Sequence, residues 1–102
     1  DGIFFTKDDG DTNLDFVVEK DSTETETTGV HTMVNDTFVT ASFYVDPNAS
    51  KVYYAIDNAE PVGVVTTNLP DNEELTVTLA IQAGEAAAKS LVVDYVTVMV
   101  ER

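Results

Sequence analysis

The sequence lacks cysteine and tryptophan altogether and contains a single histidine, His31. Without cysteine there are no disulfides, no thiolate zinc sites and no cysteine nucleophile, and one histidine is too few for a multi-histidine metal site. No run of 18 or more apolar residues occurs, so we expect neither a membrane-spanning segment nor a membrane partner. No basic region precedes an apolar stretch at the start, so we expect no signal peptide.

Positive charge is also scarce, with five Lys and Arg against nineteen Asp and Glu and a formal net charge of −14. Such a surface repels phosphate, so we expect no nucleic-acid partner and no contact with an anionic membrane. A cationic partner, a divalent cation and solubility in salty surroundings all remain open as reasons for the acidity.

The chain has 102 residues, of which 43% are hydrophobic. A compact protein of this size buries about 65% of its surface, which is enough for one modest core. We therefore predict that residues 1–102 form a single domain. The first residue is Asp1 rather than Met, so we expect a processed chain or the C-terminal part of a longer one.

The composition favours β-structure, because 16 Val and 14 Thr make up nearly a third of the residues. Alternation of apolar and polar residues predicts a half-buried strand over 75–81. A strand over 38–45 carries aromatic residues on both faces and should be covered on two sides, and Val52, Tyr54 and Ile56 share one face of the next run. Residues 91–100 are apolar on both faces, which is typical of a central strand.

Clusters of turn residues separate these runs, and they lie at 8–13, 46–50, 57–61 and 68–72. The first cluster indicates a hairpin, and residues 21–28 indicate an exposed strand or loop. The only helix-like stretch, 84–89, is too short to be stable alone and predicts a turn or a single helical coil. About seven to eight short strands at this spacing predict an all-β, antiparallel β-sandwich or jelly roll.

Three segments together resemble the C-terminal half of concanavalin-like (legume-lectin-like) β-sandwich domains, in the versions found in tailed-phage and other virion structural proteins. They are FYVDPNASKVYYAID at 43–57, TTNLP at 66–70 and AAAKSLVVDYV at 86–96. The resemblance implies a concanavalin-like sandwich. Because that family includes lectins, glycosidases and inert structural modules, the fold alone does not decide the function.

The sharpest enzymatic hypothesis rests on Glu19, Asp21 and Glu24, whose E-x-D-x-x-E spelling is similar to the catalytic strand of laminarinase-like glycosidases. That resemblance implies Glu19 as the nucleophile, Asp21 as its helper and Glu24 as the acid/base. The flanking residues are Ser and Thr rather than apolar strand residues, and a sugar cleft normally contains Trp. We therefore favour a solvated acidic face and expect no catalytic residues and no enzymatic activity.

A calcium site is the one cofactor that the sequence suggests, because Asp9, Asp11 and Asn13 have the D-x-D-x-N spacing of an oxygen-ligand loop. The EF-hand pattern does not continue, since Leu14 stands where Gly is needed and Lys20 where the bidentate Glu belongs. The alternative is a hairpin loop in which these side chains only stabilise the turn.

Among the aromatic residues, Tyr53 is the best candidate for stacking on a sugar, because it lies opposite the Val52, Tyr54 and Ile56 face. His31 has no Ser–Asp partners, so we expect it at the surface or in an interface. Asp94 interrupts an apolar run and should either find buried hydrogen-bond partners or face a loop or a subunit partner.

These observations, with the resemblance, lead to the hypothesis of a non-enzymatic structural protein on the capsid surface of a virion, most simply a phage capsid decoration (cement) protein. Its expected partners are the major capsid protein or another virion protein, and other copies of itself, with a trimer as the first choice. The alternative is a carbohydrate-binding, lectin-like module of a tail fibre or of a secreted, extracellular protein.

Overall fold

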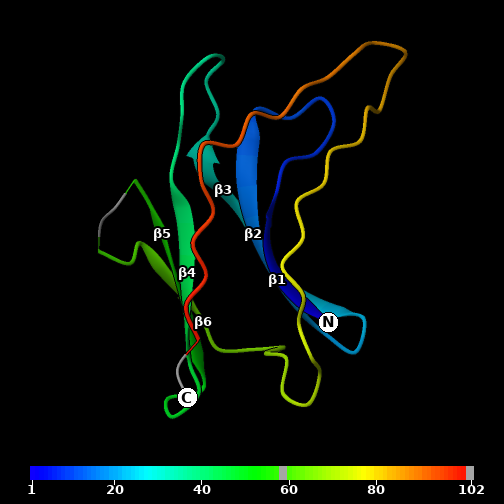
Figure 1. Ribbon diagram of the computed structural model, residues 1–102. Helices are drawn as coiled ribbons and strands as arrows, with labels where there is room; N and C mark the ends of the chain where they lie inside the picture. The colour runs from blue at the N-terminus through cyan, green and yellow to red at the C-terminus, as the bar shows by residue number, and fades with distance from the viewer. Residues whose placement is uncertain (58–59, 101–102) are drawn as a thin grey trace.

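The structure is a computed structural model that describes residues 1–57 and 60–100, and in these residues it contains strands, turns and extended segments but no helix (Figure 1). The strands are β1 (Gly2–Thr6), β2 (Asn13–Lys20), β3 (Thr23–Thr32), β4 (Ala41–Asp46), β5 (Lys51–Ile56) and β6 (Gly63–Val65). They form two antiparallel three-stranded sheets, with the orders β1-β2-β3 and β4-β5-β6. The predicted all-β class is therefore confirmed.

Tight turns connect the three strands of the first sheet. The expected hairpin at 8–13 connects β1 to β2, and its pairing runs from Gly2 opposite Glu19 to Thr6 opposite Asp15. A two-residue loop, Asp21 and Ser22, connects β2 to β3. Both residues have positive φ (49° and 62°), which matches the twist of the flanking strands in a two-residue hairpin.

The second sheet begins with the hairpin that joins β4 and β5. The Asp46 carboxylate accepts hydrogen bonds from the backbone N–H groups of Asn48 and Ala49, each at 3.0 Å. This side chain therefore organises the turn that the sequence predicts at 46–50. The next expected turn, 57–61, also separates two strands, but residues 58–59 lie outside the described part of the chain.

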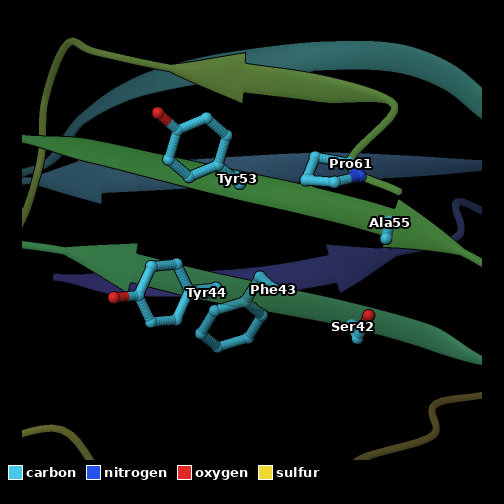
Figure 2. A pocket seen from close by; sticks show the side chains of 6 residues that line it. All are labelled: Ser42, Phe43, Tyr44, Tyr53, Ala55 and Pro61. Atoms are coloured by element: carbon cyan, nitrogen blue, oxygen red, sulfur yellow. The ribbon is translucent and has the colours of Figure 1, made fainter. Parts of the chain in front are cut away.

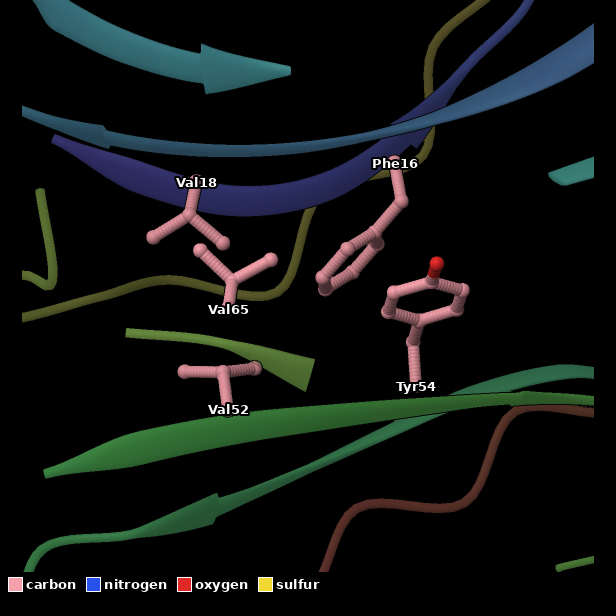
Figure 3. Packing of buried hydrophobic residues seen from close by; sticks show 5 residues of the cluster. All are labelled: Phe16, Val18, Val52, Tyr54 and Val65. Atoms are coloured by element: carbon pink, nitrogen blue, oxygen red, sulfur yellow. The ribbon is translucent and has the colours of Figure 1, made fainter. Parts of the chain in front are cut away.

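The core lies between the two sheets. Phe16 and Val18 of β2 pack against Val52 and Tyr54 of β5 and Val65 of β6 (Figure 3). The Phe16 ring is central, with its centroid 4.7 Å from that of Tyr54. The shared face expected for Val52 and Tyr54 is thus the buried one, and the arrangement is sandwich-like.

The strands expected over 75–81 and 91–100 do not form, which corrects the prediction of seven or eight strands to six among the described residues. All residues from 71 to 100 are exposed, although both apolar patterns are present. Alternation shows what a strand would bury, whereas a strand also needs a hydrogen-bonded neighbour, and neither segment has one. The jelly-roll, concanavalin-like topology stays a prediction.

The strand expected over 38–45 begins only at Ala41, and it is not covered on two sides. β4 is an edge strand, and Phe43, Tyr44 and Val45 are 45%, 58% and 42% exposed. The aromatic residues on both faces therefore mark an uncovered edge rather than a central position. The expectation of a turn at 84–89 is confirmed by bends and a hydrogen bond from Ala87 N to Glu85 O.

Candidate functional site

An aromatic hollow lies on the outer face of the second sheet, where β4 and β5 run side by side (Figure 2). In their register Tyr44 is opposite Tyr53, and Ser42 is opposite Ala55. These pairs point away from the core because the alternating partners, Phe43 and Tyr54, point into it. The hollow has a volume of about 170 Å³, and its lining consists of Ser42, Phe43, Tyr44, Tyr53, Ala55 and Pro61.

The side chains that line this hollow are suited to packing against a ligand rather than to acid–base catalysis. Figure 2 shows the rings of Tyr44 and Tyr53 on neighbouring strands with their hydroxyl groups at the same end, and Ser42 near the other end. Tyr53 is half-buried and Tyr44 is exposed, so the hollow offers aromatic surface and three hydroxyl groups, those of Ser42, Tyr44 and Tyr53, to a ligand. The lining includes no acid or base, and the volume fits one ring or one side chain rather than a larger ligand of about 300 Å³ or more.

The three residues expected to bind calcium lie in the β1–β2 loop and at the start of β2. The Asp11 carboxylate accepts a hydrogen bond from Asn13 N at 2.9 Å, and the Asn13 side-chain oxygen accepts one from the Thr32 hydroxyl at 3.1 Å. Asp9 instead packs closely against Gly84. Within residues 1–57 and 60–100, no three His, Cys, Asp or Glu side chains form a group able to hold a metal ion. The calcium site stays a prediction.

Asp9 also borders a second, wider hollow of about 680 Å³. It lies between residues 6–9 and residues 80–84, where the chain passes the end of β1. Asp9 approaches Gly84 so closely that its carboxylate would have to move if position 84 carried a Cβ. The hollow therefore marks the place where the C-terminal third contacts the first hairpin.

The E-x-D-x-x-E spelling belongs to a hairpin rather than to one bulged strand. Glu19 and Glu24 are cross-strand partners, and Asp21 lies in the turn between them. Glu19 pairs with the amino group of Asp1 at 3.6 Å, and Glu24 is exposed. These carboxylates are neighbours at the tip of a hairpin, and the solvated acidic face stays a prediction.

Sequence reasoning missed Asp15, which is the buried acidic residue among residues 1–57 and 60–100, with 5% of its surface exposed. Its carboxylate accepts a hydrogen bond from Gly29 N at 2.5 Å. The β2–β3 register shifts between Leu14 and Phe16, and Gly29 has a φ of 67°, so Asp15 holds the irregular part of β3. The sequence does hold one signal of this irregularity, because Gly29 interrupts a Thr-rich strand pattern.

The other two singled-out residues, His31 and Asp94, differ in exposure. His31 is half-buried and lies opposite Leu14 in the first sheet. Asp94 is exposed, so the structure gives it no buried hydrogen-bond partner, and a position facing a subunit partner stays a prediction.

The chain after β6 is attached to the first sheet at a few polar points. The Thr25 and Thr67 hydroxyl groups are 2.7 Å apart, and Asn68 donates to Thr25 Oγ1 at 2.9 Å. Lys20 forms a hydrogen-bonded ion pair with Asp71, which raises the pKa of Lys20 and lowers the pKa of Asp71. Beyond Asp71 every described residue is exposed.

Comparison with known proteins adds no relationship to this geometry. No family model, curated protein or solved structure matches the chain. The likeness to concanavalin-like virion domains therefore stays a prediction that rests on the three quoted segments alone. No helix in the described part of the chain is long and apolar enough to cross a membrane.

Proposed function

We propose that this chain is a non-enzymatic structural protein that works by binding other protein subunits. The observation that carries the proposal is its exposed apolar surface. The accessible area is 7866 Å², which is about 2,200 Å² more than the roughly 5,700 Å² of a compact 11.1 kDa protein. The large apolar side chains of residues 75–81 and 91–100 are exposed, and exposed apolar patches are typical of interaction sites.

The resemblance to virion domains supports a particular setting, the capsid surface, with the major capsid protein as the partner. A decoration protein of this kind stabilises the lattice by mass action, because it binds the assembled form and not the separated subunits. A net charge of −14 favours docking on basic patches of the capsid and keeps decorated particles apart.

The test is to look for the chain in purified particles of the virus that encodes it. Mass spectrometry should find it in a fixed ratio to the major capsid protein. Particles stripped of it should release their DNA at a lower temperature, and the purified chain should restore the original temperature. Its absence from particles, or its presence without any effect on particle stability, would contradict the proposal.

A carbohydrate-binding module is the second candidate, and the aromatic hollow of β4 and β5 is the observation that favours it. Tyr53 would stack on a sugar ring, and the hydroxyl groups around it would orient the ligand. A glycan array followed by titration calorimetry should detect binding that Tyr53→Ala removes and Tyr95→Ala, an exposed tyrosine outside the hollow, preserves. No binding at millimolar sugar would exclude this function.

A further inference from the structure

The outer face of the second sheet carries apolar side chains where such a face is normally polar. In an antiparallel sheet that packs one face on the core, the other face usually consists of polar side chains. Here Tyr53 of β5 is opposite Tyr44 of β4 on one side and opposite Val64 of β6 on the other. Tyr44 and Val64 are 58% and 49% exposed. A row of apolar side chains thus crosses all three strands outside the core, and the aromatic hollow lies at its β4–β5 end.

Two carboxylates flank one end of this hollow. Asp57 directly follows β5, two residues beyond Ala55 and therefore about 7 Å away along the strand. Its carboxylate accepts a hydrogen bond from Thr40 N at 3.1 Å. Glu60 is exposed and directly precedes Pro61, which lines the hollow. Both carboxylates act on a ligand in the hollow, because charges interact over about 10 Å in 0.1 M salt.

The opposite end of the hollow brings together one acid and one base. Asp46 is opposite Lys51 in the β4–β5 register, so their charges offset each other. The Asp46 carboxylate is also the acceptor for two backbone amides of the turn. The hollow therefore combines a neutral, aromatic lining with a negative potential that comes from the Asp57 and Glu60 end.

A flat cation suits this combination best. The faces of tyrosine rings attract cations, and the planar guanidinium group of arginine stacks on such rings while its N–H groups donate to nearby hydroxyl groups. The ammonium group of lysine is more strongly hydrated and does not stack. Phosphate and carboxylate ligands are repelled by a surface with a net charge of −14. The volume of about 170 Å³ matches one side chain.

We propose that the aromatic hollow binds an arginine side chain of the partner protein. The inference rests on the proposed function and deepens it, because it gives the basic surface of the partner a specific point of contact on this chain. Val62 and Val64 follow Pro61 and are 59% and 49% exposed, so apolar surface for the polypeptide around that arginine lies next to the hollow. A sugar would not require the flanking carboxylates, so charge separates the two ligand classes.

Titration of the full chain followed by nuclear magnetic resonance is the direct test, because it detects weak binding residue by residue. The probes are two capped tripeptides with glycine at both ends, one with arginine in the centre and one with citrulline, which has nearly the same shape without the charge. The arginine peptide should shift the amide signals of β4 and β5 and bind about 2- to 30-fold more tightly than the citrulline peptide, as expected for a cation–π contact. Its binding should weaken as salt rises from about 0.05 to 0.5 M.

Matched variants assign the effect to the ring and to the flanking charge. Tyr53→Leu removes the ring and should abolish the preference for arginine, whereas Tyr53→Phe keeps the ring and should preserve it. Glu60→Gln should weaken binding of the arginine peptide at low salt. Glu24→Gln removes the same charge from an exposed position in the first sheet and should leave binding unchanged. Circular dichroism checks that each variant keeps the fold.

Three results would overturn the inference. The first is equal binding of the two peptides, or binding that Tyr53→Leu leaves unchanged. The second is perturbation of the same signals by methyl glycosides and by neither peptide, which would identify the hollow as a sugar site. The third is binding of free L-arginine as tight as that of the peptide, which would show that the hollow takes the amino acid rather than a side chain of a protein.

Stripped particles separate this inference from the proposed function. Tyr53→Leu should restore their thermal stability less than the wild type does, and Tyr53→Phe should restore it equally. Full restoration by Tyr53→Leu would overturn this inference alone. Arginine-selective binding by a chain that is absent from particles would instead overturn the proposed function.

Discussion

Phe16→Ala tests whether the two sheets share one core. Phe16 is fully buried in β2, and its ring centroid lies 4.8 Å from that of Phe5 in its own sheet. In the other sheet the centroids of Tyr54 and Phe43 lie at 4.7 and 6.1 Å. Removing this ring leaves a cavity between the sheets that is lined by three other aromatic rings.

The expected cost follows from this burial. Truncation of a buried phenylalanine to alanine typically lowers the free energy of unfolding by about 3–5 kcal/mol, through lost transfer energy and the remaining cavity. Domains of this size lose about 4–8 °C of melting temperature per kcal/mol, so the variant should melt at least about 12 °C lower. The free energy of unfolding of a native domain is only about 5–15 kcal/mol. The Phe16→Ala variant, which loses one of five central core residues, should therefore lose most of its folded population on warming.

Urea unfolding followed by circular dichroism measures the effect, with Phe38→Ala as the matched control. Phe38 is 69% exposed, so its truncation should change the free energy of unfolding by less than about 0.5 kcal/mol. A Phe16→Ala cost below about 1 kcal/mol, or equal to that of the control, would refute the shared core. The sheets would then be independent hairpin units.

Three further predictions concern single contacts. Gly63→Ala should destabilise the fold, measured as a lower urea midpoint, because a Cβ at this position would collide with the Tyr54 ring. Asp15→Ala should cost about 1–3 kcal/mol in the same assay, since the backbone donor that it satisfies loses its acceptor. The ion pair with Lys20 lowers the pKa of Asp71, so its stabilisation is present at neutral pH and lost on acidification. The midpoint difference between wild type and Asp71→Asn should therefore be present above the ordinary aspartate pKa of 3.8 and be lost as the pH falls below it.

The parts of the fold that local residue chemistry determines were predictable. Asp46 with Pro47 and Asn48 indicates a turn whatever surrounds it, and the carboxylate of Asp46 does bond the turn amides. The common face of Val52 and Tyr54 follows from the period of two, and burial of that face follows from their apolar character. These are properties of a few neighbouring residues.

Pairing, by contrast, could not be predicted from those patterns. Residues 91–100 have the composition of a central strand, yet their burial depends on a neighbour that their own sequence does not specify. The role of Asp15 likewise depends on Gly29, which is fourteen residues away in the sequence and lies in the part of β3 where the register shifts. For the site, Tyr53 was predictable from alternation, whereas its partner Tyr44 required the β4–β5 register.

Salt separates the two interfaces expected for this protein, one with other copies of itself and one with the capsid, because the net charge acts on them with opposite sign. Two copies with a net charge of −14 each repel one another, so screening that repulsion should strengthen contact between copies. Docking on a basic capsid patch is an attraction between unlike charges, so the same screening should weaken it. Sedimentation from about 0.05 to 0.5 M salt should therefore show growing oligomers, while retention on particles declines. If both respond in the same direction, the acidic surface does not distinguish the partners, and the reason for its charge lies elsewhere.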